Sequence, residues 1–253
     1  RERRAPGQQE TPAPEHTPQR GHGAPRWPAS PAASGAPEAT LERHRDLGLE
    51  VRTVLRQMRG VQRLRLVACG LTDSWVTALC HSGGSVKWRG LRTLDLSSNL
   101  LSPLCCGALA GVIAAGLEDL TLDGNCLEAE GIRVLHASVR PGQRWDLKTL
   151  SLVDNQVAYP GGAATAELLA GERTGSCLRE LRLARNPRMS TACQVTLLDA
   201  IGHAGGSCGC SLRALDLSQC LPAGQPPPPQ LERAAAGLLS RCPGIELRLG
   251  GPP

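Results

Sequence analysis

Leucine and other apolar residues recur at fixed intervals along most of the chain. Counted from the start of each copy, positions 1, 4 and 6 are apolar, and position 9 is Asn or Cys. The alternation around positions 4 and 6 predicts a short β-strand with one buried face. Six copies begin at Val61, Leu91, Leu117, Leu147, Leu178 and Leu212, and a last partial copy ends in Leu247 and Leu249.

The ninth position marks the turn where the chain leaves each predicted strand. An Asn side chain there can bond backbone groups of the turn, so that buried polar groups keep hydrogen-bond partners. A Cys in the same place is expected to act as a small buried group. These predicted structural residues are Cys69, Asn99, Asn125, Asn155, Asn186 and Cys220.

The segments between the strands predict helices. Successive copies begin 26 to 34 residues apart, which leaves room for a full helix in each connection. Apolar residues at helical spacing predict helices over 75–79, 108–113, 131–135, 166–170 and 195–201, and a first helix over 47–58. One such unit cannot bury its apolar face alone, so neighbouring copies must stack.

Residues 47–249 resemble the leucine-rich repeats of the ribonuclease-inhibitor type, which also occur in NOD-like receptors and in Ran GTPase-activating proteins. The resemblance rests on the motif L-x-x-L-x-L-x-x-N/C and its long period. It implies an α/β fold, a curved leucine-rich-repeat solenoid with parallel strands on the concave face and helices on the convex face.

Two Pro-rich segments lie outside the repeat pattern. Residues 1–40 hold eight prolines and no apolar periodicity, so we expect a disordered leader, followed by the repeat domain over 41–253. The second segment is the run Pro226 to Pro229, which suits either a stiff loop in the last repeat or a polyproline ligand.

The outward positions of the strands are the predicted surface for a partner protein. Alternation turns them away from the leucine core. Acidic residues gather in the second and third copies, with arginines on either side. The predicted partner-binding residues are Arg63, Arg65, Asp95, Asp119, Thr121, Asp123, Ser151, Glu180, Arg182 and Asp216.

Composition narrows the classes of partner and compartment. Eleven cysteines in a chain without a recognisable export signal indicate reduced thiols and an intracellular protein of the cytoplasm or nucleus. The net charge of +5 comes from scattered arginines, so contact with nucleic acid is not indicated. No apolar run reaches the roughly 18 residues of a membrane span, so no membrane contact is expected.

No candidate catalytic group emerges from the sequence. The histidines are scattered, and no Gly-rich phosphate loop is present. Cys208 and Cys210 lie near His203, but the C-x-C spacing without a second pair is poor for zinc. We therefore predict no enzymatic activity, no cofactor and no metal.

The leading hypothesis is a non-catalytic scaffold that binds a protein partner on the concave face. The resemblance leaves two alternatives open. A GTPase-activating protein of the Ran type would use an Arg or Asn in early loops of the solenoid. The ligand-sensing repeat region of a NOD-like receptor would follow a nucleotide-binding domain.

Overall fold

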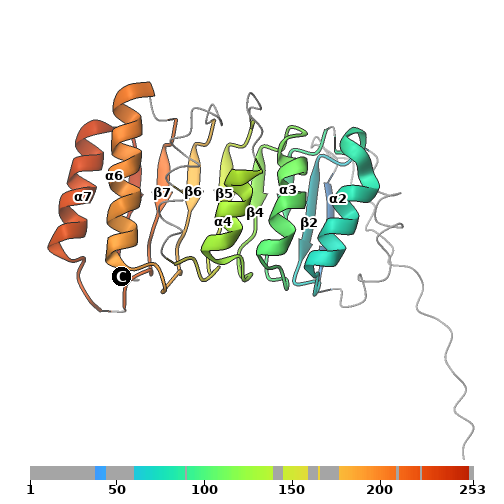
Figure 1. Ribbon diagram of the computed structural model, residues 1–253, viewed down its shortest axis with the longest axis horizontal. Helices are drawn as coiled ribbons and strands as arrows, with labels where there is room; N and C mark the ends of the chain where they lie inside the picture. Colours follow the sequence, from blue (N-terminus) through green and yellow to red (C-terminus); the bar gives the residue numbers. More distant parts are fainter. Residues whose placement is uncertain are drawn as a thin grey trace, which may run out of the picture.

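The repeats build two layers, with a row of helices against one face of an eight-stranded sheet (Figure 1). The computed structural model describes residues 38–43, 60–88, 90–138, 145–158, 165, 177–208, 211–222 and 224–250. The strands lie in chain order, and every neighbouring pair is parallel. This architecture is that of a leucine-rich-repeat solenoid, so the predicted fold class is confirmed.

The elements alternate along the chain. The strands are β1 Glu38–Glu42, β2 Arg63–Val67, β3 Thr93–Asp95, β4 Asp119–Thr121, β5 Thr149–Ser151, β6 Glu180–Arg182, β7 Ala214–Asp216 and β8 Glu246–Arg248. The helices are α2 Asp73–Lys87, α3 Cys106–Ile113, α4 Glu128–Ala137, α6 Thr191–Cys208 and α7 Pro229–Arg241, with the 3₁₀ turn η2 Pro103–Cys105 before α3.

The leucines at position 4 of each copy form one continuous buried layer. Leu94 pairs with Leu64 on one side and with Leu120 on the other. The same register continues through Leu150 to Leu181 and beyond. All five side chains are at most 1% exposed. Burial of one leucine contributes about 1.5–3 kcal/mol, so this layer supplies much of the stability.

The strand β1 is an element that the sequence pattern did not predict. It pairs in parallel with β2, so that Ala39 lies beside Leu64. The chain then turns at Arg43, whose φ of 56° matches the φ of 53° at Ala68 in the next copy. β1 is thus a further repeat strand, hidden because an alanine takes the place of the first leucine. Residues 38–40 of the predicted leader belong to it, and residues 1–37 lie outside the described part.

The repeat asparagine bonds backbone groups of two successive turns. Oδ1 of Asn99 accepts hydrogen bonds from the N–H groups of Cys69 and Leu71, both at 3.0 Å. Its Nδ2 donates to the carbonyls of Leu66 and Leu96, both at 2.8 Å. Each asparagine therefore satisfies groups of its own repeat and of the preceding one. Three further asparagines follow the same scheme, namely Asn125, Asn155 and Asn186.

Cysteine replaces this asparagine in two repeats and is buried there. The Sγ of Cys69 donates to the carbonyl of Val67 at 3.3 Å, and the Sγ of Cys220 donates to that of Leu183 at 3.1 Å. Both thiols are at most 3% exposed. They fill the core as small groups, as the sequence pattern predicted.

Four of the predicted helices coincide with observed ones. The stretches 75–79, 108–113, 131–135 and 195–201 fall within α2, α3, α4 and α6. The stretches 47–58 and 166–170 lie outside the described residues. Helices pack about 8–10 Å apart and strands only about 4.8 Å, so the helix layer follows the longer arc. The sheet face turned away from the helices is therefore the concave face.

The helix α7 is a second element that the pattern missed. Pro228 caps it in an extended conformation, and Pro229 is its first residue. Proline suits this position because its fixed φ fits a helix and its missing N–H would have no helical partner. The proline run thus leads directly into a helix that packs on α6.

The core is not purely aliphatic, although only 2% of the residues are aromatic. Trp75, Trp88 and Trp145 are each at most 4% exposed and belong to the same core as the leucines. Trp75 is the third residue of α2, and Trp88 follows the end of that helix. These three aromatic side chains therefore serve as buried bulk.

Candidate protein-binding face

The in-register strands line up their outward side chains in rows across the concave face. The first row is Glu38, Arg63, Thr93, Asp119, Thr149, Glu180, Ala214 and Glu246. The second row is Thr40, Arg65, Asp95, Thr121, Ser151, Arg182, Asp216 and Arg248. All ten predicted partner-binding residues lie on this face, nine in these rows and Asp123 just beyond β4.

Nine of the ten predicted residues are exposed or half-buried, and Ser151 is not. Only 1% of Ser151 is exposed. Its hydroxyl donates to Oδ1 of Asp123 at 2.6 Å, and the N–H of Val153 donates to the same oxygen at 2.9 Å. Ser151 therefore orients Asp123 instead of facing a partner.

Four charged residues of the face were missed by the sequence analysis. Glu38 and Glu42 belong to the unpredicted strand β1, and Glu246 and Arg248 belong to β8, in the partial last copy. With them, the outward strand positions and Asp123 carry eight carboxylates and four guanidinium groups. The concave face is thus net negative on a chain whose net charge is +5.

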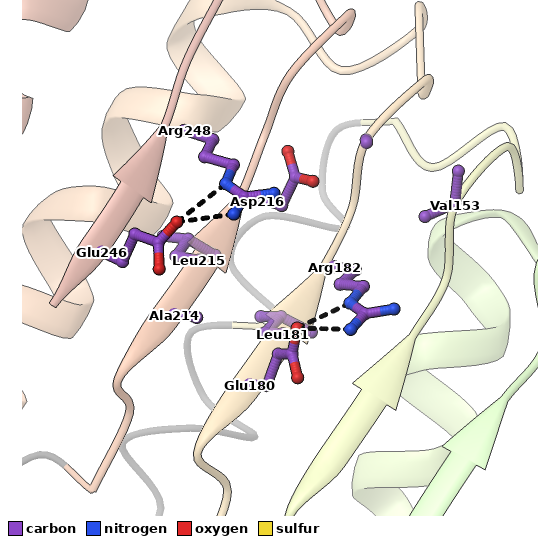
Figure 2. Close-up of a pocket in the computed structure, with 10 residues that line it drawn as sticks. Val153, Glu180, Leu181, Arg182, Ala214, Leu215, Asp216, Glu246 and Arg248 are labelled. Atoms are coloured by element: carbon purple, nitrogen blue, oxygen red, sulfur yellow. Dashed lines mark hydrogen bonds and ion pairs between the residues drawn. The ribbon is translucent and has the colours of Figure 1, made fainter.

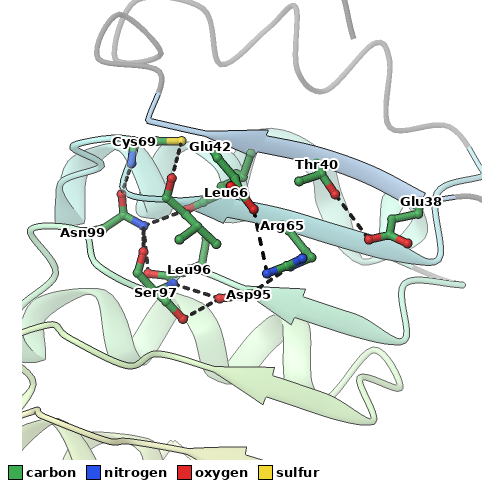
Figure 3. A network of polar contacts seen from close by, with 11 residues as sticks. Glu38, Thr40, Glu42, Arg65, Leu66, Cys69, Asp95, Leu96, Ser97 and Asn99 are labelled. Carbon is green, nitrogen blue, oxygen red and sulfur yellow. Dashed lines mark hydrogen bonds and ion pairs between the residues drawn. The ribbon is translucent and has the colours of Figure 1, made fainter. Parts of the chain in front are cut away.

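A polar network crosses the first three strands (Figure 3). Nε of Arg65 donates to Oδ2 of Asp95 at 3.2 Å, and the same guanidinium lies 3.9 Å from Glu42. The hydroxyl and the N–H of Ser97 both donate to Oδ1 of Asp95, at 2.5 and 3.0 Å. Arg65 is therefore held between carboxylates of two neighbouring strands, which fixes its position on the face.

The middle of the face keeps acidic groups available. Asp119 accepts one hydrogen bond, from the hydroxyl of Thr93 at 3.2 Å. Directly before β4, Glu118 forms ion pairs with Lys148 and with Arg92, the latter at 3.0 Å. The hydrogen bond from Lys148 is the main cause that lowers the pKa of Glu118; burial opposes it, and the charges of Lys148 and Arg92 lower the pKa further. Asp119 therefore remains the more available carboxylate for a partner.

A hollow of about 470 Å³ opens on the concave face between β5 and β8 (Figure 2). Glu180 and Arg182 of β6 border it on one side, and Glu246 and Arg248 of β8 on the other. Each arginine is paired with the glutamate of its own strand, with Nη2 2.6 Å from Oε1 in both pairs. The small side chain of Ala214, on the strand between, leaves the space open.

The described cysteines are free thiols, and several are held protonated. Burial raises the pKa of Cys80 to about 12 and is the main cause that raises the pKa of Cys220 to about 11. The pKa of Cys105 is also raised, first by a hydrogen bond with Cys106 and then by burial. Nucleophilic chemistry needs the thiolate, so these groups are inert near neutral pH.

The described residues contain no group of three or more His, Cys, Asp and Glu side chains that could hold a metal ion. His203 bonds the carbonyl of Asp199 at 2.6 Å, as expected within a helix. Cys210 lies outside the described residues, so the Cys208–Cys210 pair is not described. Within the same ranges, no helix has the length and apolar character to cross a membrane.

The repeat sheet and its open polar face have the architecture of a leucine-rich-repeat solenoid. No family model matches the chain, and no curated protein matches it. Among solved structures, the chain is similar to TLR13 in a complex of TLR13 with ssRNA13, at 17% sequence identity and a TM-score of 0.47. The match covers 85% of this chain and 26% of that one, so the chain spans about a quarter of the TLR13 length.

Proposed function

We propose that the protein is a non-catalytic scaffold that binds a partner protein on its concave face. The observation that carries the proposal is the parallel register, which gathers charged side chains from seven of the eight described strands on one surface. Most of these residues are exposed or half-buried. Several are already oriented by neighbours, as Arg65 is by Asp95. Preorganised polar groups of this kind lose little entropy when a partner binds.

The net negative charge of the concave face favours a protein partner over nucleic acid. Nucleic-acid affinity depends largely on cations that neutralise phosphates. On this face, carboxylates outnumber guanidinium groups two to one, and each arginine of β6 and β8 is paired with a glutamate. A phosphate backbone would be repelled here.

We further propose that the scaffold acts in replication-fork repair and genome maintenance, in the nucleus. The support is a sequence resemblance of residues 146–152, 184–190 and 215–220 to the C-terminal repeats of Tonsoku-like protein. Free thiols at the described cysteines suit the reducing interior of a cell. The test is imaging of the tagged chain in cells with stalled forks. A chain that stays away from the forks contradicts this role.

The scaffold proposal is tested by charge reversal on the concave face. The double variant Asp119→Lys/Arg182→Glu changes two residues whose side chains leave the backbone hydrogen bonds of the turns intact. Proteins captured by the wild type and by the variant are compared quantitatively by mass spectrometry. We expect the variant to lose the specific partners, because like charges placed opposite a partner cost several kcal/mol.

The matched control reverses two charges on the helix side. Glu130 and Arg133 form an exposed pair within α4, and the exchange Glu130→Lys/Arg133→Glu keeps their mutual attraction. This control should capture the same partners as the wild type. If the concave-face variant also captures them all, partner binding on that face is excluded.

A further inference from the structure

The hollow between β5 and β8 has features that specify its ligand. Its floor is formed by β7, with Ala214 and Asp216 as the outward residues. Register places Asp216 between Arg182 and Arg248, and Ala214 between Glu180 and Glu246 (Figure 2). The flanking strands lie roughly 10 Å apart, which is twice the strand spacing. That width admits one extended side chain above the methyl group of Ala214.

The charges in the hollow leave one carboxylate uncompensated. Arg182 donates to Oε1 of Glu180 from Nε at 2.7 Å, and Arg248 donates to Oε1 of Glu246 from Nε at 3.0 Å and from Nη2 at 2.6 Å. Within the described part of the chain, no hydrogen bond or ion pair joins a cation to Asp216, whose Oδ1 accepts the N–H of Ser218 at 2.9 Å. The net charge is therefore negative, and its centre lies on the middle strand.

The second carboxylate oxygens supply the coordination that a cation needs. Among the described residues, no hydrogen bond reaches Oε2 of Glu180, Oε2 of Glu246 or Oδ2 of Asp216. The pKa of Arg248 is raised by Glu246 first, with smaller contributions from Asp216 and Glu180, so the three carboxylates act across one space. An anionic ligand would have to displace a glutamate from its arginine, whereas a cationic one would displace nothing.

We propose that this hollow binds an arginine or lysine side chain from a basic segment of the partner protein. The cation lies above Ala214 and donates hydrogen bonds to the free carboxylate oxygens of Glu180, Asp216 and Glu246. The inference rests on the proposed scaffold function and names the chemistry of its partner. The net negative charge of the whole concave face, on a positively charged chain, attracts the same kind of segment from a distance.

The probe is a capped nine-residue peptide with three arginines separated by Gly and Ser. The control peptide carries citrulline at the same positions, which keeps the shape and removes the charge. Binding to the full chain is followed by amide chemical shifts in NMR spectra at low salt. We expect the arginine peptide to shift the amides of Ala214 and Asp216, and the citrulline peptide to leave them unchanged.

Two variants test the hollow itself. Ala214→Leu fills the space and should weaken binding of the arginine peptide by about tenfold, since one buried charge-assisted contact is lost. Asp216→Asn removes the uncompensated charge and should weaken it by about fivefold, as for a partly exposed ion pair. The matched control is Asp199→Asn, which removes one exposed carboxylate from α6, outside the concave face, and should change binding by less than about twofold.

The possible outcomes separate this inference from the proposed function. If the arginine peptide does not bind, if citrulline binds equally well, or if Ala214→Leu and Asp216→Asn leave binding unchanged, the hollow is not a cation site. The scaffold proposal stands in all these cases, provided that reversal at Asp119 and Arg182 still abolishes partner capture. If that reversal has no effect, the scaffold proposal fails whatever the peptide does. Melting curves of both hollow variants establish that they are folded.

Discussion

At the scale of single residues, the repeat asparagine accepts hydrogen bonds from backbone N–H groups of the turn in the preceding repeat. Asn99 completes the hydrogen bonds of Cys69 and Leu71, in the preceding copy. Asn186 does the same for Asn155 and Val157. These backbone groups are buried, and no water can replace the missing partner without opening the stack. The motif residue therefore stabilises a contact between neighbours more than it stabilises its own strand.

Replacement of Asn99 should show this cost directly. Asn99→Ala leaves two buried N–H groups and two carbonyls without their side-chain partner, so we expect a loss of about 2–4 kcal/mol in the free energy of unfolding. Asn99→Cys should cost less, about 1–2 kcal/mol, because a thiol can bond part of the turn. Urea denaturation of both variants gives the comparison. Equal losses would show that the thiol contributes nothing beyond its volume.

At the scale of elements, β1 protects the first edge of the leucine sheet. It pairs with all five residues of β2. Without it, β2 would expose a row of unpaired backbone groups, and such edges template association between chains. The neighbouring loop also depends on it, because the N–H of Arg43 donates to the carbonyl of Val67 at 2.9 Å. β1 therefore covers the edge of β2 that faces away from β3.

Replacement of Glu38–Glu42 by glycine and serine should remove this protection. We expect the free energy of unfolding to fall by about 2–4 kcal/mol, through the lost interface between repeats, and self-association to increase. Urea denaturation and size-exclusion chromatography measure the two effects. The control is Thr40→Ser, which keeps the strand and the hydroxyl group and should change neither. A stable monomer after the loss of β1 would contradict this role.

The elements also show what a repeat pattern can and cannot predict. Six strands and four described helices follow from leucine spacing, because each depends on a periodic buried face. The sequence pattern did not predict β1 because Ala39 replaces a leucine. It did not predict α7 because prolines stand at the start of that helix. On the face, outward positions look alike in sequence. Only the turn geometry shows that Ser151 is buried and bonded to Asp123, whereas the carboxylate of Asp119 stays accessible.

At the scale of the whole molecule, contacts join each repeat only to its neighbours. The strand order follows the chain order without any crossover, and α6 packs on α7 as α2 packs on α3. The free energy of unfolding is then roughly the sum of contributions from single repeats and from the interfaces between neighbours. A weakened end therefore need not unfold the centre. Each of the eight described strands contributes side chains to the concave face.

Two buried leucines in different places should therefore behave differently. Leu150 lies in the central strand β5 and Leu238 in the terminal helix α7, and each is 1% exposed. Either change to alanine costs about 2–5 kcal/mol locally. By hydrogen exchange, we expect Leu238→Ala to lose protection in α7 and β8 alone, and Leu150→Ala to lose it on both sides. Uniform loss in both variants would contradict the one-dimensional description.

The backward reach of the asparagines has a consequence for synthesis. A ribosome releases the chain from its N-terminus, so the turn of each repeat emerges before the asparagine that completes it. The turn at Leu127, for example, waits about 28 residues for Asn155. Throughout translation, the newest repeat is therefore unfinished, and only the older ones are closed. The nascent protein grows as a folded rod with one open end, and each repeat at that end closes when the next repeat emerges.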